Sequence, residues 1–216
     1  TAAPQPPLTL SSPLPIDFDV FNGDADGICA LHQLRLAEPR AAILITGAKR
    51  QIALLARVAE TLRAAGAVAV RPRRVTVLDI AIERNRPALD ALLADGARIE
   101  WFDHHEPGII PPDPALVAHI ATDPEVCTSI LVDRQLGGRF RRWAICAAFG
   151  DGMAGPAASL SERLSREQSL SISELDQLRV IGEAINYNAY AADTGTALLD
   201  SAELYRRLAG ITDPLD

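Results

Sequence analysis

The chain has 216 residues, 48% of them hydrophobic, which is enough for one domain of ordinary size or for one domain with a small appendage. Its formal net charge of −7 argues against a protein that binds long nucleic-acid polymers, because such binding rests on lysines and arginines that neutralise phosphates. Lysine occurs once, at Lys49.

The first segment, residues 1–15, is rich in proline and serine and predicts a flexible or extended arm. It lacks the charged and apolar regions of a secretory signal, and no apolar stretch approaches the roughly 18–20 residues of a membrane span. Three cysteines form no C-x-x-C pair and lie among apolar residues, which indicates buried free thiols: Cys29, Cys127 and Cys146. We therefore expect a cytoplasmic protein without a membrane partner.

From residue 16 onwards, short apolar runs alternate with segments of helical periodicity. The pattern predicts strands over residues 16–21, 41–46, 75–82, 98–102 and 116–121, and helices over 27–37, 50–66, 86–95 and 124–136. This alternation is typical of an α/β fold with an open, mainly parallel five-stranded sheet and helices on both faces, followed here by a helical C-terminal tail. We expect three parts: the arm over 1–15, an α/β domain over 16–155 and a helical extension over 156–216.

Acidic and histidine side chains stand where predicted elements end. They are Asp24 and Asp26 after the first strand, Asp79 near the end of the third, Asp103-His104-His105 after the fourth, and Asp151 between two glycines farther on. Ligands of an open parallel sheet bind beyond the carboxyl ends of its strands, so we expect these groups to converge. Clustered carboxylates repel one another and need cations. Aspartate oxygens with a histidine nitrogen suit Mn²⁺, with Mg²⁺ as the alternative.

Each of these motifs taken alone has a simpler explanation. A D-x-D sequence in a glycine loop usually forms a turn, and an aspartate such as Asp123, followed by proline, usually caps a helix. We interpret Asp133 as a surface charge, His119 as a core histidine of a strand and His32 as a structural histidine of a helix. The order of the motifs along the chain, more than any one of them, favours a metal site.

The motif set resembles that of the DHH family of phosphoesterases, over about residues 16–155. The matching residues are Asp24-Ala25-Asp26, Asp79, Asp103-His104-His105 and Asp151. The resemblance implies a two-manganese hydrolase of phosphodiester or phosphoanhydride bonds. By position, one ion would be held by Asp24 and Asp79, and the other by Asp26, Asp79, His104 and Asp151. The resemblance also implies that His105 contacts the scissile phosphate or protonates the leaving group, and that Asp103 orients a histidine.

Two features depart from the family pattern. Many members have a histidine ligand four residues before the first aspartate, where this chain has Val20. The first ion site is therefore expected to be weaker, with Asn22 as a nearby oxygen donor. Family members also carry a second domain with a glycine-rich, histidine-containing motif, and no such segment follows Asp151. We expect that the chain is truncated before this domain, and that the domain or a second copy of the chain is a partner.

The predicted function is hydrolysis of phosphodiester bonds in a small anionic substrate, such as a short oligonucleotide, a linear dinucleotide or a nucleoside bisphosphate. Lys49 and Arg50 follow the second strand and are candidates, with Asn22, for substrate binding; alternatively, they only begin the next helix. A pyrophosphatase or polyphosphatase would need the same ions without base recognition. From another class, the chain could be a non-catalytic binding or regulatory module on a decayed scaffold, which Val20 favours.

Overall fold

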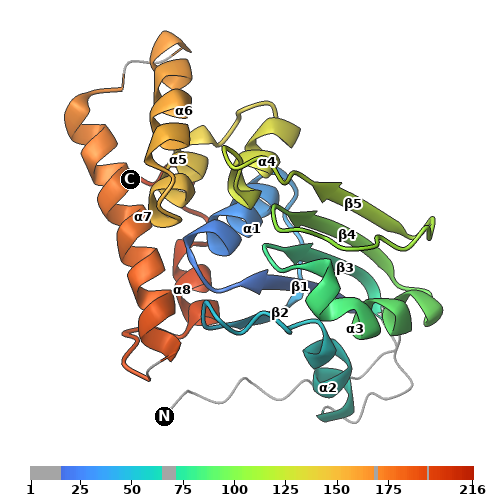
Figure 1. The fold of residues 1–216 in the computed structure, drawn as a ribbon. Coiled ribbons are helices and arrows are strands. Elements are labelled where there is room, and N and C mark those ends of the chain that lie inside the picture. Colours follow the sequence, from blue (N-terminus) through green and yellow to red (C-terminus); the bar gives the residue numbers. More distant parts are fainter. Residues whose placement is uncertain (1–15, 65–71, 168–169, 194) are drawn as a thin grey trace.

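Five parallel strands form one open sheet in a computed structural model that describes residues 16–64, 72–167, 170–193 and 195–216 (Figure 1). The strand order is β2-β1-β3-β4-β5, which confirms the predicted sheet. The strands are β1 Ile16–Asn22, β2 Ile43–Gly47, β3 Pro72–Leu78, β4 Arg98–Asp103 and β5 Leu116–Ile120. The predicted arm over 1–15 lies outside the described residues.

The register brings the carboxyl ends of the central strands to one edge of the sheet. Asn22 at the end of β1 lies beside Gly47 of β2, and Leu78 at the end of β3 lies beside Phe102 of β4. The loops that directly follow these strand ends therefore begin in the same region, as expected for a parallel sheet.

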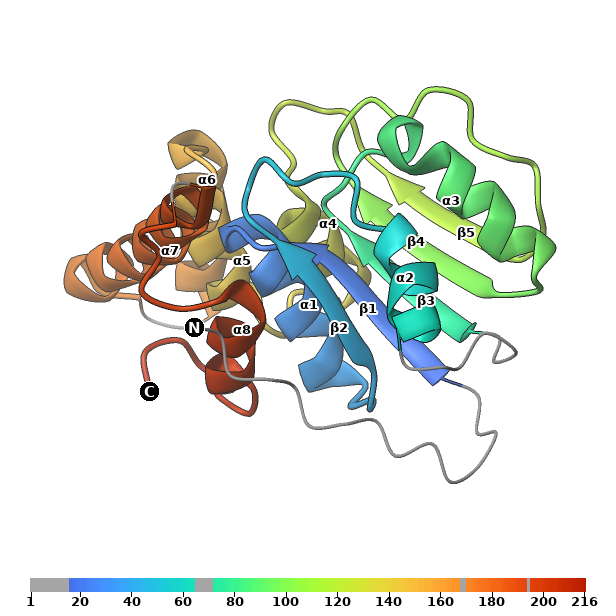
Figure 2. The ribbon, with the colours of Figure 1, turned by 90° about the horizontal axis from the view of Figure 1, so that it is seen from below.

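Helices cover both faces of the sheet, as Figure 2 shows. One face packs against α1 (Ala25–Ala37), α4 (Thr128–Gln135) and α5 (Arg141–Gly150), and the other packs against α2 (Ala56–Ala64) and α3 (Ile82–Ala94). Along β1, Phe18 and Val20 belong to the core beneath α2 and α3, whereas Phe21 belongs to the core beneath α1. This follows from the two-residue period of a strand.

The structure corrects several helix predictions. Helix α2 begins at Ala56 rather than at residue 50, and α3 begins at Ile82, earlier than predicted. Helix α4 begins at Thr128 with Cys127 as its N-cap, so Asp123 is no helix cap; its side chain accepts the N–H of Glu125 instead. Helix α5 was not predicted, because its apolar run is buried on almost every side and therefore shows no amphipathic period.

The C-terminal tail is helical, as predicted, and it packs onto the α/β layer. Its helices are α6 (Ala154–Glu167), α7 (Ile172–Asp193) and α8 (Ser201–Leu208). Helix α7 lies along α5, and the ring of Tyr205 on α8 lies 5.5 Å from the ring of Phe21 on β1. The tail thus shares a core with the sheet. Within the described ranges, no helix combines the length and apolarity needed to cross a membrane.

The three cysteines are buried and free, as predicted. Burial raises the pKa of the Cys29 and Cys127 thiols well above the ordinary value, with smaller contributions from nearby carboxylates. Both thiols therefore stay protonated at neutral pH and act as small apolar packing groups.

Substitution of Gly182 tests the contact between α7 and α5. An added Cβ would overlap with the carbonyl oxygen of Cys146, so Gly182→Ala should push α7 away from α5 and destabilise the fold by about 1–3 kcal/mol. Urea unfolding followed by circular dichroism measures this change. The control Val180→Ala lies on the same helix at a position that is 52% exposed, and it should change stability by less than about 0.5 kcal/mol. An unaltered midpoint in Gly182→Ala would contradict the close contact.

The buried His32 should make the fold sensitive to acid. Its Nε2 atom lies 2.8 Å from the carbonyl oxygen of Ile211, and its ring meets the edge of Trp143. Burial lowers the pKa of His32, and the bond to Ile211 opposes this only in part. The pKa of His32 in the folded state thus lies below the unfolded value of about 6.5. Its contribution to stability is complete above about pH 6.5 and is lost as the pH falls from there through the folded-state pKa.

We therefore expect the urea midpoint to fall between about pH 7 and pH 5 more steeply in the wild type than in His32→Gln. His119→Gln, which removes a partly exposed histidine, is the matched control. Equal slopes in the wild type and His32→Gln would show that His32 does not cause the acid sensitivity.

Candidate metal centre

The loop between β1 and α1 places two aspartates in the interior. Asp24 is the N-cap of α1, and its Oδ1 accepts the N–H of Gly27 at 3.0 Å. Asp26 accepts the N–H groups of Ser129 at 2.7 Å and Thr128 at 2.8 Å, which open helix α4. A helix N-terminus stabilises negative charge, so α1 and α4 both hold a carboxylate at this edge of the sheet.

Asp79 follows β3 with a backbone φ of 58°, and among the described residues it is the only non-glycine residue with a positive φ. Its N–H donates to the carbonyl oxygen of Phe102 at 3.0 Å, and its Oδ1 accepts from the Thr128 hydroxyl at 3.2 Å. This conformation costs a residue with a Cβ about 1–2 kcal/mol. Strain of this kind is concentrated at functional positions, where the surrounding contacts maintain it.

Asp103 ends β4 and is fully buried. Its Oδ1 lies 2.7 Å from Nδ1 of His105, whose side chain is 47% exposed. The hydrogen bond to Asp103 raises the pKa of His105, while burial opposes the shift. With Nδ1 engaged by Asp103, Nε2 of His105 is the ring nitrogen left to face a ligand.

His104 lies at the centre of the acidic cluster. Its Nε2 is 3.5 Å from an oxygen of Asp79, 3.9 Å from one of Asp26 and 4.0 Å from one of Asp151. Two groups of three residues place ligand atoms within 4.8 Å of one another: Asp79-His104-His105 and Asp26-His104-Asp151. The structure thus brings together side chains that are far apart in the sequence, and imidazole and carboxylate groups of this kind fit Mn²⁺ or Mg²⁺.

The charges of the cluster also favour a cation. Burial, and then repulsion by Asp24 and Asp26, raise the pKa of Asp79 well above its ordinary value. Burial and repulsion by Asp26 raise the pKa of Asp151, which Lys49 opposes. A bound divalent cation would remove this penalty, because it becomes the largest local charge and favours the ionised carboxylates. The donor set and its charge therefore both fit a metal ion.

Lys49 points into the cluster, and its side chain is only 20% exposed. Its Nζ donates to Oδ2 of Asp24 at 2.7 Å, to Oδ1 of Asp151 at 3.0 Å and to Oδ1 of Asn186 at 3.2 Å. Burial lowers the pKa of Lys49, but the two carboxylates more than offset this and the net shift is upward. Arg50 beside it is exposed, and the alternative that this pair begins a helix is wrong because α2 starts at Ala56.

Several parts of the site were not predicted from the sequence. Thr128 and Ser129 bind Asp26, and Asn186 on α7 binds Lys49; neither contact leaves a local signal, because the partners are distant in the chain. The amide nitrogen of Asn22 donates to the Lys49 carbonyl at 3.3 Å, so Asn22 positions this loop. Val20 is fully buried in the core beneath α2 and α3 and offers no ligand atom.

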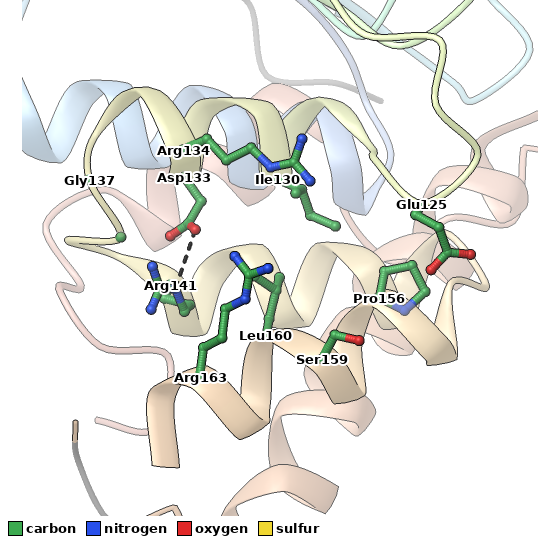
Figure 3. Close-up of a pocket in the computed structure, with 11 residues that line it drawn as sticks. Glu125, Ile130, Asp133, Arg134, Gly137, Arg141, Pro156, Ser159, Leu160 and Arg163 are labelled. Atoms are coloured by element: carbon green, nitrogen blue, oxygen red, sulfur yellow. Dashed lines mark hydrogen bonds and ion pairs between the residues drawn. The ribbon is translucent and has the colours of Figure 1, made fainter. Parts of the chain in front are cut away.

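A cavity of about 440 Å³ lies between α4, α5 and α6 (Figure 3), and none of its lining residues belongs to the acidic cluster. Arg134, Arg141 and Arg163 line it together with Asp133. Asp133 is 2% exposed and accepts from Nε of Arg141 at 3.3 Å, so its interpretation as a surface charge was wrong. Burial raises the pKa of Asp133, while the arginine opposes the shift.

The two remaining histidines are also placed by the structure. His32 lies in the core, as expected of a structural histidine. His119 is partly exposed and stacks on Phe102 with ring centroids 4.4 Å apart, so it lies nearer the surface than a core histidine would.

Comparison with known proteins gives a likeness in fold alone. No protein-family model matches the chain, and no curated protein matches it. Among solved structures, the exonuclease RecJ bound to manganese is similar, with a TM-score of 0.50 and 19% sequence identity over 88% of this chain and 60% of that one. RecJ from Thermus thermophilus in complex with Mn²⁺ gives a TM-score of 0.48 and 20% identity over 91% of this chain and 34% of that one. The chain thus spans less than two thirds of either protein.

Two substitutions at Asp79 separate backbone strain from charge. Asp79→Gly removes both the carboxylate and the cost of a positive φ, whereas Asp79→Ala removes the carboxylate alone. We expect Asp79→Gly to be more stable than Asp79→Ala by about 1 kcal/mol in urea unfolding with EDTA present. Equal stabilities would show that the conformation at this position carries no strain.

Proposed function

We propose that the chain is a metal-dependent phosphoesterase that hydrolyses phosphodiester bonds in a small anionic substrate, of the class of a short oligonucleotide, a linear dinucleotide or a nucleoside bisphosphate. The observation that carries the proposal is the cluster around His104 at the carboxyl edge of the sheet. Potential ligand atoms lie within 4.8 Å of one another in each of two groups, Asp26-His104-Asp151 and Asp79-His104-His105. A likeness in fold to an exonuclease bound to manganese supports it.

In this proposal Asp26, Asp79, His104 and Asp151 hold Mn²⁺ or Mg²⁺. A bound divalent ion lowers the pKa of a coordinated water and offsets the charge that builds on phosphorus-bound oxygens. His105, fixed through its Nδ1 by Asp103, presents Nε2 to the phosphate or the leaving oxygen. Thr128 and Ser129 keep Asp26 in place, so that this carboxylate does not have to reorganise during the reaction.

The phosphodiester assignment rests on the chemistry of the donor set and on the acidic balance of the chain. With a net charge of −7, the surface disfavours long polyanions, so contact with a few phosphates is the mode that fits. Arg50, an exposed residue that directly follows Lys49 in the chain, is a candidate for one such contact. A pyrophosphatase would need the same ions, and the choice of substrate in the assay separates the two.

Loss of Asp79 should abolish the activity. With Mn²⁺ present, the purified chain is expected to hydrolyse a linear dinucleotide faster than inorganic pyrophosphate, and EDTA should stop the reaction. Asp79→Ala should lower the rate more than about 100-fold, beyond the effect typical of residues that only support metal ligands. The control Asp90→Asn alters an aspartate on α3 that is paired with Arg86 at the surface, and it should retain the wild-type rate.

Each outcome of this assay has a distinct meaning. Faster hydrolysis of pyrophosphate would replace the diester by an anhydride as substrate. Bound Mn²⁺ without hydrolysis of either compound would favour the non-catalytic module. Wild-type hydrolysis by Asp79→Ala would refute the metal centre as the seat of the reaction.

A further inference from the structure

The three hydrogen atoms of the Lys49 ammonium match three oxygen acceptors. An ammonium has three donors and no acceptor, and Nζ lies within 3.2 Å of one oxygen each from Asp24, Asp151 and Asn186. Two of these oxygens carry negative charge. The group therefore has the surroundings of a bound cation: it is enclosed by oxygens, and its hydrogen-bonding capacity is used within the protein.

Asp24 is the carboxylate that faces this ammonium. Both of its oxygens are engaged, Oδ1 by the N–H of Gly27 and Oδ2 by Lys49. Asp24 belongs to neither of the two groups of clustered ligand atoms, and both of those groups contain His104. Asp151 stands between the two regions, because its Oδ1 accepts from Lys49 while its Oδ2 lies 4.0 Å from Nε2 of His104.

The backbone and the neighbours of Lys49 hold it in this position from two sides. The Asn22 amide donates to the Lys49 carbonyl, and the Lys49 N–H donates to the carbonyl oxygen of Ala189 at 3.4 Å. The Tyr190 ring lies 5.3 Å from Nζ, within range of a cation–π contact. Helix α7 thus contacts Lys49 through three of its residues, Asn186, Ala189 and Tyr190.

We propose that the centre takes one divalent ion, held around His104, and that the Lys49 ammonium permanently occupies the place of a second cation between Asp24 and Asp151. This inference rests on the proposed function and refines it, because it replaces the two expected ions by one ion and a tethered charge. Val20, four residues before Asp24 in the sequence, fits this division, because its side chain is buried and has no ligand atom. Lys49 is then a positioning residue for Asp151 and not a contact to substrate.

The stoichiometry of Mn²⁺ binding tests the proposal without reference to activity. Titration calorimetry of the wild-type chain should give one ion per chain. Lys49→Met keeps the length of the side chain and removes its charge, so Asp24 and Asp151 become free to bind, and two ions should appear. The control Arg84→Met removes a cation from an exposed position of α3 and should still give one ion.

The outcomes separate this inference from the proposed function. Two ions in the wild type would overturn the inference and leave the phosphoesterase proposal standing. If neither the wild type nor Lys49→Met binds an ion, both the inference and the proposed function are overturned. One ion in both proteins would show that Lys49 excludes no cation, and would also overturn the inference.

A second measurement uses the wild type, in case Lys49→Met does not fold. Because the chain has one lysine, labelling with ε-¹⁵N lysine gives a single side-chain ammonium signal. The ammonium hydrogens of Lys49 should be protected from exchange with water. They should stay protected after Mg²⁺ is added, at a concentration that calorimetry shows to be high enough to displace Mn²⁺. A shift to the rapidly exchanging signal of an exposed lysine under these conditions would show that the ion expels Lys49, and would overturn the proposal.

Discussion

The burial of carboxylates at one edge of the sheet is the constraint on which the rest of the structure depends. Asp24, Asp26, Asp79 and Asp103 are each at most 2% exposed, and charges this close together cannot remain ionised without compensation. The chain supplies that compensation from several elements at this edge. Helices α1 and α4 direct their N-terminal N–H groups at Asp24 and Asp26, and two histidines follow the end of β4. The parallel sheet makes this convergence unavoidable, because its strands end together.

The helical tail completes the site as well as the core. Helix α7 crosses α5 closely at Gly182, and the same helix supplies Asn186 to the ammonium of Lys49 a turn farther on. Helix α5 ends at Gly150, directly before Asp151. The packing of α7 on α5 therefore sets the distance between the Asp151 carboxylate and the Asn186 amide, which both accept from the Lys49 ammonium. A shift of α7 on α5 would therefore alter the charge balance of the centre without a substitution at any of its carboxylates.

The sequence predicted those features that depend on local pattern. Five apolar runs predicted the five strands. Of the residues that follow them, the structure places ligand atoms of Asp26, Asp79, His104 and His105 in two groups that share His104. Features that depend on distant partners were not predictable. The sequence predicts an exposed Asp133, yet its side chain is buried and accepts a hydrogen bond from Arg141 of the next helix. From its place after β2, Lys49 was a candidate for contact with a substrate phosphate. Its contacts with Asn186 and Ala189 of the distant helix α7 show that its ammonium instead faces inward.

A tethered ammonium and a metal ion would not be equivalent in such a centre. Both offset the charge of Asp24 and Asp151, but an ammonium has no open coordination position and cannot activate a water, so any nucleophile would have to form on the His104 side. The ammonium is also present at every metal concentration, and it spares the fold the repulsion that Asp24 and Asp151 would otherwise exert on each other. Asymmetry of this kind would fix the direction of attack, because only one side of the centre could deliver the water.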